Sequence, residues 1–408
     1  MKRIKDSVHD HIPISGVARD LLDTPELQRL RRIRQLGTVS LVYPSANHTR
    51  FEHSLGVYHL ACEALDSLGV EGKTAKRVEA AAICHDIGHG PFSHNLERLI
   101  QRHTGRYHDD VTELLADGGV GDVLRNHALD PERVAGLIAG EGQYGQLVSG
   151  ELDVDRMDYL VRDAHHTGVP YGTIDHGRLV RELTYVDGEL VLREGNVQTA
   201  ESLLVARALM NPTVYSHSVA RISKATLRRA AATLLEAGET DAETLARMDD
   251  LDLTVALRSC EATREFAARL DERRLYKRAV WAEIDDVPGS IIEADTEAIR
   301  ALEREIAEAS DVVPSSVIVD VPAQPSMTES TTRVMVGGEM RQLGHQSPLV
   351  DALRAAQYAQ WRLGVYCPAA VRERVGTAAV DTLGLDIDGP LVCDVRSGYP
   401  TTLDQFLE

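Results

Sequence analysis

The sequence predicts a mainly α protein with a small inserted β-hairpin and a smaller C-terminal α+β region. Two observations favour this fold class. Over about residues 25–238, apolar residues recur at helical spacing, as in Leu27, Leu30, Ile33 and Leu36. Beyond about residue 285, β-branched runs are interrupted by Pro and Gly, as in SSVIVDVPAQPSMTESTTRVMVGGEM. We therefore expect a helical domain over residues 1–284 and an α+β region of unassigned role over residues 285–408.

Local signals predict the individual elements of the helical part. Thr24 is a suitable N-cap, Pro25 a suitable first helical residue, and Gly37 the expected end of that helix. The alternating segment LTYVDGELVLREG, residues 183–195, is centred on Asp187-Gly188. This dipeptide is typical of a two-residue hairpin turn, so we expect a β-hairpin inserted between helices.

Two more segments are expected to be helical. The acidic, Ala-rich stretch over residues 237–304 predicts solvent-exposed helix, and residues 350–363 have the pattern of one amphipathic helix. We find no internal repeat and no low-complexity segment.

Composition and charge exclude several functional classes. The chain has 408 residues, and its 44 Lys+Arg against 63 Asp+Glu give a formal charge of −19. That sign excludes a non-specific nucleic-acid binder and a basic membrane-surface protein. Only six of the basic residues are Lys, and aromatic residues make up 4%. This halophilic composition resembles that of salt-adapted cytoplasmic proteins, so the acidic surface does not identify a ligand.

The cysteines and the N-terminus predict a cytoplasmic protein. Five cysteines are scattered without CxxC spacing, namely Cys62, Cys84, Cys260, Cys367 and Cys393. An odd, scattered set supports neither a disulfide framework nor a zinc ribbon. The first residues, MKRIKDSVHDHIPI, contain no apolar run of signal-peptide length, and no run of about 18 apolar residues predicts a membrane span.

Histidines are concentrated in the first part of the chain. Eight of the 16 lie within about sixty residues, namely His48, His53, His59, His85, His89, His94, His103 and His108. Three segments stand out: NHTRFEHSLGVYHLA at 47–61, ICHDIGHGPFSHNLE at 83–97 and ELDVDRMDYLVRDAHH at 151–166. We interpret the three segments together as one metal site.

Each segment is expected to contribute ligands from a different helix. His53 lies near the start of one predicted helix, His85 and Asp86 near the end of a second, and Asp155 near the start of a third. Adjacent helical residues point about 100° apart, so His85 and Asp86 share an ion only if other helices close its coordination shell. Two imidazoles and two carboxylates suit a borderline divalent ion and leave positions for water and a phosphate oxygen.

Taken singly, these residues also have ordinary structural interpretations. A lone His on an apolar helix is more often a hydrogen-bonded core residue than a ligand, and a His-Asp dipeptide occurs by chance in many proteins. The ordered combination of His, His-Asp and Asp on separate helices, with further histidines at 89, 94 and 108, favours the metal site.

The order H…HD…D resembles that of the HD-domain phosphohydrolases. The flanking segments TRFEHSLGV, CHDIGHGPFSH and LDVDRMDYLVRDAHHTG are similar to those of the deoxynucleoside triphosphate triphosphohydrolase branch, from about Ile4 to Leu227. The resemblance implies a helical HD domain, a divalent metal ion and a homo-oligomer, either dimer or tetramer. The ion is expected to be Mn, Fe, Co, Ni, Zn or Mg, and the sequence leaves this choice open.

The resemblance also implies a role for each matching residue. The implied metal ligands are His53, His85, Asp86 and Asp155. The implied catalytic residues are His89, His94, His108 and Glu97, where Glu97 replaces an Asp of the animal relatives. The implied substrate-binding residues, with Arg50 on the phosphates, are Arg50, Gln35, Leu36, Arg156, Tyr159, Asp163, Arg207 and Tyr215.

A separate group of residues matches a guanine-nucleotide effector site of the animal enzyme. These residues are Asp23, Gln28 and Arg31 in the segment DTPELQRLRRIRQLG. Helical spacing puts Gln28 and Arg31 on one face, as such a site requires. The segment QRLRRIR is equally compatible with an ordinary charged helix face.

The function that we expect from the sequence is metal-dependent hydrolysis of dNTPs to deoxynucleoside and inorganic triphosphate. One alternative keeps the site and changes the substrate to a nucleoside monophosphate or a phosphodiester. Another alternative is a nucleotide-sensing module with a non-catalytic metal site. The complete set of four ligands favours an enzyme over the sensing module.

Overall fold

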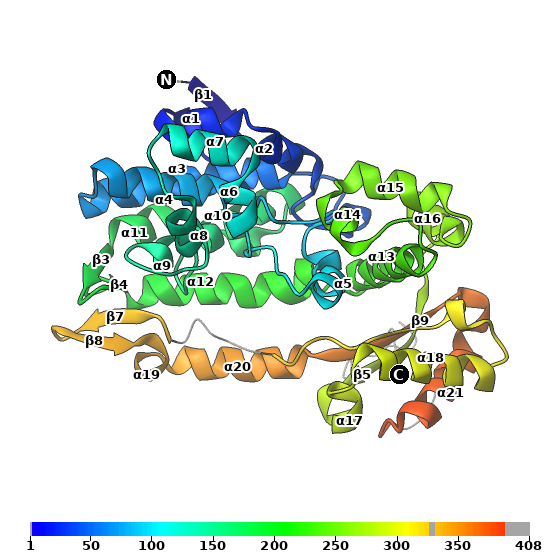
Figure 1. Cartoon of the computed structure of the whole chain (residues 1–408). Helices are drawn as coiled ribbons and strands as arrows, with labels where there is room; N and C mark the ends of the chain where they lie inside the picture. The colour runs from blue at the N-terminus through cyan, green and yellow to red at the C-terminus, as the bar shows by residue number, and fades with distance from the viewer. Residues whose placement is uncertain (1, 326–330, 388–408) are drawn as a thin grey trace. The chain divides into compact units, whose positions relative to one another are not determined.

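The computed structural model describes residues 2–325 and 331–387, which form two compact units (Figure 1). Among these residues, the first unit contains 2–273 and 331–354, and the second contains 274–325 and 355–387. The boundary therefore falls earlier than the expected 284/285, and residues 331–354 return to the first unit.

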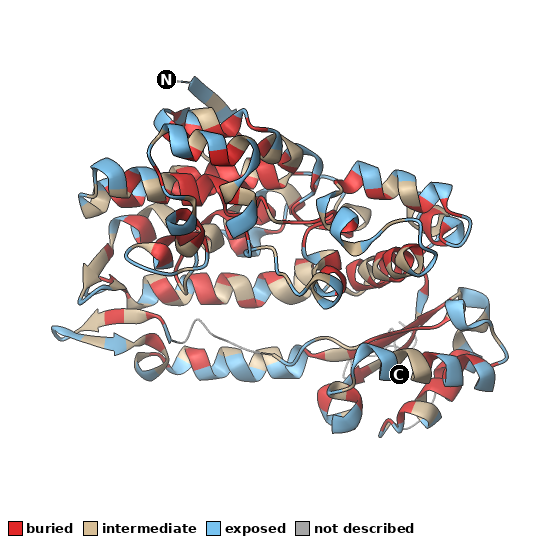
Figure 2. Ribbon diagram, in the orientation of Figure 1, coloured by how far each residue is buried: buried red, intermediate tan, exposed pale blue. Residues whose placement is uncertain are grey.

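The first unit is mainly helical, as the sequence predicts. Its helices are α1 (Gly16–Leu22), α2 (Pro25–Arg29), α3 (Arg50–Leu68), α4 (Gly72–Cys84), α5 (His94–Thr104), α6 (Thr112–Ala116), α7 (Gly118–Asn126), α8 (Pro131–Ile138), α9 (Gly145–Val148), α10 (Val154–Thr167), α11 (His176–Arg181), α12 (Val197–Met210), α13 (Ser218–Glu236), α14 (Ala242–Arg247), α15 (Asp250–Ser259), α16 (Arg264–Asp271) and α19 (Leu343–Gln346). Buried residues run along α3, α4 and α12 (Figure 2), where they contribute to one large apolar core.

Capping residues fix where the helices of the site begin. Thr49 and Glu52 form a capping box at the start of α3, with the Glu52 carboxylate accepting from the Thr49 amide at 2.7 Å. Asp153 is the N-cap of α10 and accepts from the Arg156 amide at 2.7 Å. These caps place His53 and Asp155 in the early turns of their helices.

The helix predicted from Pro25 begins as expected after Thr24, but it does not continue to Gly37. Helix α2 ends at Arg29, a 3₁₀ turn covers Leu30–Arg32, and Ile33 is extended. The backbone of residues 33–35 pairs instead with residues 48–50, through Arg50 N to Ile33 O and Gln35 N to His48 O. Tertiary pairing with the start of α3 therefore overrides the helical pattern.

The predicted hairpin over residues 183–195 is confirmed as strands β3 (Leu183–Val186) and β4 (Glu189–Leu192). The sequence did not indicate that it is half of a larger sheet. Strand β4 pairs in parallel with β7 (Arg333–Val336), which pairs in turn with β8 (Glu339–Gln342). A second unpredicted hairpin joins β1 (Lys2–Asp6) to β2 (Asp10–Ile14) at the N-terminus.

The second unit is the predicted α+β part. Its sheet has the order β5-β9-β6, formed by β5 (Lys277–Glu283), β6 (Ile318–Asp320) and β9 (Arg362–Cys367). The helices α17 (Gly289–Ile292), α18 (Thr296–Ala309) and α21 (Arg372–Leu383) belong to the same unit, while α20 (Pro348–Gln360) extends across the division at 354/355.

Two predictions for this region were wrong in part. The stretch 237–304 contains β5, whose central residues are buried, so this stretch is not all exposed helix. The helix predicted over residues 350–363 spans Pro348–Gln360 instead, because Leu363 lies within β9 and packs in the sheet.

The described part of the chain, residues 2–325 and 331–387, contains four of the five cysteines. Cys62, Cys84, Cys260 and Cys367 carry no disulfide, and Cys393 lies outside the described residues. In the same part of the chain, none of the helices combines the length and apolar character that crossing a membrane requires.

Candidate active site

Three helices bring the four expected metal ligands together. His53 comes from α3, His85 and Asp86 follow the last turn of α4, and Asp155 lies in the first turn of α10. His53 Nε2 is 2.8 Å from Asp155 Oδ1 and 3.3 Å from His85 Nε2, and His85 Nε2 is 3.4 Å from Asp86 Oδ1. We call these four residues the ligand cluster.

The Nδ1 atoms of His53 and His85 contact oxygen atoms on the side away from the centre of the ligand cluster. His85 Nδ1 donates to the Ala82 carbonyl at 2.8 Å, and His53 Nδ1 lies 2.7 Å from a carboxylate oxygen of Asp158. A carbonyl only accepts, so the His85 proton lies on Nδ1 and the Nε2 lone pair faces the centre. This arrangement orients metal-binding histidines in proteins generally.

Electrostatics also favours a cation at the centre of the ligand cluster. Burial alone would lower the pKa of His53, but hydrogen bonds to Asp155 and Asp158 raise it to about 10. Burial would raise the pKa of Asp155, but the contact with His53 lowers it to about 2. Ligand atoms of His53, His85 and Asp86 all lie within 4.8 Å of one another. The donor set therefore fits a divalent metal ion.

A buried network behind His53 was missed at the sequence level. Asp158 accepts from His9 at 2.6 Å and from Arg162 at 2.8 and 3.0 Å, and Arg162 also donates to Asp6 at 2.9 Å. The spacing of three residues between Asp155 and Asp158 on α10 was the available signal, because it puts both carboxylates on one helix face. Asp6 and His9, by contrast, reach the site through the unpredicted β1–β2 hairpin.

Helix α3 must pass very close to this network. A Cβ at Gly56 would lie 1.8 Å from Asp158 Oδ1 and 2.5 Å from Arg162 Nη2. Glycine at this position therefore permits the close approach of α3 and α10 that brings His53 to Asp158.

The expected catalytic residues form a second group, which we call the histidine cluster: His89, His94, His108 and Glu97. Glu97 contacts His94 Nδ1 at 2.7 Å and makes a short hydrogen bond to His108 Nδ1. The His89 and His108 rings stack with centroids 4.1 Å apart. Burial opposes protonation of His108, but Glu97 outweighs it and raises the pKa of His108.

Close backbone packing holds His108 next to His89. A Cβ at Gly88 would lie 2.0 Å from the carbonyl oxygen of His108. The glycine therefore lets the loop after α4 contact the loop after α5, so that histidines from both loops meet.

Arg50 lies between the two clusters. It is buried, its Nη1 is 3.0 Å from both oxygens of Asp86, and its Nε donates to Ser93 Oγ at 2.9 Å. After burial, the Arg50 guanidinium is the next cause that lowers the pKa of His89 well below its usual range. The predicted phosphate-binding arginine is thus held beside both clusters.

The residues expected to contact sugar and base also lie together. Asp163 accepts from His48 at 2.7 Å and from the Tyr215 hydroxyl at 2.9 Å, and the Tyr159 and Tyr215 rings lie 6.3 Å apart. Burial raises the pKa of Tyr159 to about 12 against the opposing charges of Arg207 and Arg156.

The remaining substrate residues lie beside this group. Gln35 is buried next to His48 through a backbone hydrogen bond of 3.0 Å, and its Oε1 has no hydrogen-bond partner in the described part of the chain. Leu36 is partly buried and packs against the large apolar core of the first unit. Arg156 donates to Asp153 at 2.7 Å.

The expected effector residues lie along α2 and its edges. Arg31 Nε donates to Gln28 Oε1 at 2.9 Å, and its guanidinium lies 3.6 Å above the Phe51 ring. Asp23 instead pairs with Lys2 at 3.3 Å. Gln28 and Arg31 thus share one face, as predicted, and Asp23 contacts the N-terminal hairpin.

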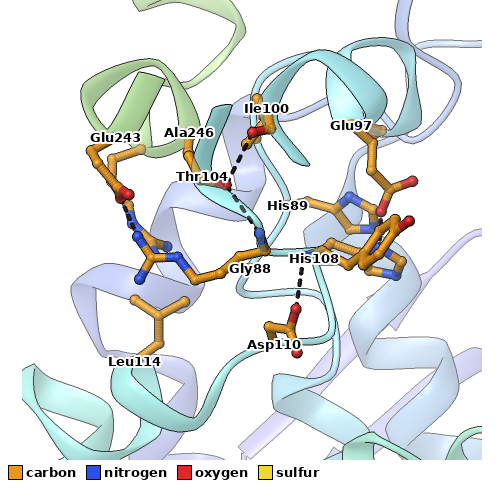
Figure 3. A pocket seen from close by; sticks show the side chains of 15 residues that line it. Gly88, His89, Glu97, Ile100, Thr104, His108, Asp110, Leu114, Glu243 and Ala246 are labelled. Atoms are coloured by element: carbon orange, nitrogen blue, oxygen red, sulfur yellow. Dashed lines mark hydrogen bonds and ion pairs between the residues drawn. The ribbon is translucent and has the colours of Figure 1, made fainter. Parts of the chain in front are cut away.

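A hollow lies beside the histidine cluster (Figure 3). His89, Glu97 and His108 line it together with Arg106 on the loop after α5 and Ala246 on α14. Arg106 pairs there with Glu243. The hollow thus adjoins the candidate catalytic histidines.

Comparisons with known proteins agree with this geometry. The HD domain family matches residues 50–163, and the HD associated region matches residues 174–393. An uncharacterized protein of Methanocaldococcus jannaschii is 32% identical over 377 residues, which cover 90% of this chain and 79% of the relative.

Two further proteins are similar to this chain. The human deoxynucleoside triphosphate triphosphohydrolase SAMHD1 is 30% identical over 268 residues, covering 54% of this chain and 43% of its own length. The crystal structure of a phosphohydrolase from Bacteroides thetaiotaomicron matches with a TM-score of 0.72 and 26% identity, covering 90% of this chain and 99% of the other. The chain therefore belongs to the HD-domain phosphohydrolase superfamily, and over about half of its length it is similar to a deoxynucleoside triphosphate triphosphohydrolase.

Proposed function

We propose that this protein hydrolyses deoxynucleoside triphosphates to the deoxynucleoside and inorganic triphosphate. The observation that carries the proposal is the position of Arg50, which touches Asp86 of the ligand cluster and Ser93 next to the histidine cluster. A cation-binding centre, a phosphate-binding arginine and proton-donating histidines are thus adjacent. These are the groups that phosphoryl chemistry requires.

The ligand cluster holds the metal in this proposal. His53, His85, Asp86 and Asp155 would hold a divalent ion, which would supply Lewis-acid polarisation of a phosphoryl oxygen and would make a water more acidic. Asp158 and the Ala82 carbonyl keep both imidazoles oriented for it.

Side chains around the centre bind the phosphates and move a proton. Arg50 and Arg156 offset the negative charge on the phosphoryl oxygens, which is the dominant contribution expected in phosphoryl transfer. His94 or His108 donates a proton to the departing 5′ oxygen, and Glu97 orients both rings. Glu97 raises the pKa of His108, which makes the protonated form of His108 more accessible than that of an ordinary histidine.

The sugar and base contact the group around Asp163. In the proposal, Tyr159 packs against the sugar, Gln35 and Leu36 lie at its edge, and Arg207 and Tyr215 flank the base. Gln35 Oε1, buried without a partner among the described residues, is a suitable acceptor for a sugar hydroxyl.

Two alternatives remain distinct from this proposal. The same site would suit a nucleoside monophosphate or a phosphodiester, and a sensing module would keep the metal without turnover. Tyr159, Arg207 and Gln35 favour a triphosphate over the smaller phosphoesters. The complete ligand set favours turnover over sensing.

Regulation and assembly form the second part of the proposal. A guanine nucleotide would bind at Asp23, Gln28 and Arg31, and the enzyme would work in the cytoplasm as a dimer or tetramer. The adjacency of Gln28 and Arg31 supports such a site.

A product assay tests the proposal. Purified protein in high salt with Mn or Mg is incubated with each dNTP, with and without GTP, and the products are resolved by ion-pair chromatography. Deoxynucleoside plus triphosphate is the expected outcome, and dependence on GTP would support the effector site. Release of monophosphate, or no turnover of any dNTP, would contradict the dNTP assignment and favour one of the two alternatives.

A further inference from the structure

Arg29, the last residue of α2, has an unusual set of partners. Its Nε donates to the Arg247 carbonyl at 2.8 Å, and its Nη2 lies 2.8 Å from the His89 carbonyl. The same Nη2 is 3.2 Å from the Ala246 carbonyl and 2.7 Å from the Met248 carbonyl. All these acceptors are main-chain oxygens, and within residues 2–325 and 331–387 Arg29 forms no ion pair with a carboxylate.

The acceptors belong to two segments far apart in the sequence. His89 lies in the loop between α4 and α5, which also carries Asp86 of the ligand cluster. Ala246, Arg247 and Met248 are at the carbonyl end of α14, where a helix dipole attracts a cation. Burial lowers the pKa of Arg29 to about 10, so the guanidinium remains charged at neutral pH.

Arg29 joins two walls of the hollow beside the histidine cluster. His89 and Ala246 both line that hollow (Figure 3), and Arg29 binds the carbonyl of each. A second connection supports the same junction, because Asp250 accepts from the Phe92 amide at 2.6 Å and from the Arg34 amide at 3.1 Å. The loop of His89 is therefore fastened to residues 246–250 at two points.

We propose that Arg29 is a positioning residue that holds the main chain at His89 against the end of α14, and so sets the place of the His89 ring. Its link to turnover rests on the proposed function, because His89 belongs to the histidine cluster. Its place between the His89 loop and the end of α14 rests only on the four hydrogen bonds.

The planar guanidinium is essential to this role. It presents donors in a fixed fork, whereas a lysine ammonium is a single point with no such geometry. Arg29→Lys would keep the charge and lose some of the carbonyl contacts. Arg29→Met would remove all of them and leave polar main-chain groups without partners.

Arg32 provides a matched control. It lies three residues further along and pairs with Asp249, so it contacts the same segment after α14 without reaching His89. Its side chain is about half exposed. Arg32→Met therefore removes a basic contact to residues 246–250 while leaving the His89 carbonyl bound.

The experiment measures amide hydrogen exchange and steady-state kinetics for full-length, Mn-loaded wild type, Arg29→Lys, Arg29→Met and Arg32→Met. Exchange in peptides covering residues 87–93 should be faster in both Arg29 variants and unchanged in Arg32→Met. With a dNTP substrate, kcat should fall about 10- to 100-fold in Arg29→Met and less in Arg29→Lys, with KM and bound Mn unchanged.

Three outcomes would overturn the proposal. These are wild-type exchange at residues 87–93 in the folded Arg29 variants, the same acceleration in Arg32→Met, and a change in KM without a change in kcat. If Arg29→Met does not fold, Arg29→Lys decides. If the wild type turns over no nucleotide, the proposed function fails, and the exchange measurement still decides the role of Arg29.

Discussion

The ligand cluster and the histidine cluster use the same residue types but suit charges of opposite sign. In the ligand cluster, carboxylates of Asp86 and Asp155 lie beside the Nε2 atoms of His53 and His85. In the histidine cluster, the carboxylate of Glu97 lies behind the rings, on the Nδ1 side of His94 and His108.

The position of the carboxylates decides what each cluster attracts. Two carboxylates next to converging nitrogens concentrate negative charge, and this charge favours a dication. One carboxylate behind two rings raises the pKa of His108, whereas burial lowers the pKa of His94, and the nearby Arg50 adds positive charge. We therefore infer that the first cluster holds metal and that the second contacts a phosphoryl group.

The largest expected effect comes from removing a carboxylate from the ligand cluster. Asp155→Ala should lower turnover by at least about 10³-fold and release bound metal, because it removes one of the four donors of the ligand cluster. Metal content by elemental analysis and product release by chromatography measure both effects. Asp122→Ala is the control, since Asp122 is an exposed residue of α7 that pairs with Arg125. Unchanged turnover in Asp155→Ala would contradict the ligand assignment.

The second largest effect should come from moving the histidine cluster without touching the metal. A Cβ at Gly88 would lie 2.0 Å from the His108 carbonyl, so Gly88→Ala must displace His108. Turnover should fall about 100-fold while bound metal stays at the wild-type level. At Gly289 a Cβ has nothing within 4 Å, so Gly289→Ala is the control. Loss of metal in Gly88→Ala would show that the two clusters are not separable.

Part of this comparison could be made from the sequence alone. The four ligands lie near the ends of helices that begin and end at strong local signals, such as the Thr49 cap of α3. Their spacing therefore predicted their convergence. Asp158 accepts a hydrogen bond from His9 of the β1–β2 hairpin. Arg29 donates hydrogen bonds to the end of α14, which lies more than 200 residues further along the chain. Local patterns do not reveal such contacts.

The same reason explains the errors in the fold. Residues 33–35 have a helical pattern but pair with residues 48–50, and Leu363 fits a helical period but completes β9. The return of β7 to β4 joins residues about 140 apart in the chain. In each case a distant partner determined the outcome.

A smaller effect is expected from changing Asp158, which contacts Nδ1 of the ligand His53. Asp158→Asn keeps the shape but weakens the hold on His53 Nδ1, so metal affinity should fall about 10- to 100-fold. Titration with Mn or Co measures the change. Excess metal should restore most of the turnover, which would distinguish Asp158 from a ligand. Turnover that stays low at saturating metal would instead place Asp158 among the reacting groups.

The smallest expected effect concerns the proton donor of the histidine cluster. Glu97 raises the pKa of His108 above its usual value of about 6.5. A protonated donor loses activity as pH rises through its pKa, so the alkaline limb of the rate profile should lie above pH 6.5. Glu97→Gln removes the charge that raises the pKa of His108, so the alkaline limb should move to lower pH.

Asp158→Asn is the control for the pH shift expected in Glu97→Gln. In Asp158→Asn at saturating metal, the alkaline limb should stay where it is in the wild type, because Glu97 and His108 are unaltered. A limb that moves in Asp158→Asn but not in Glu97→Gln would assign the titrating proton to the ligand cluster. The proton donor would then belong to the ligand cluster, beside the metal, and not to the histidine cluster.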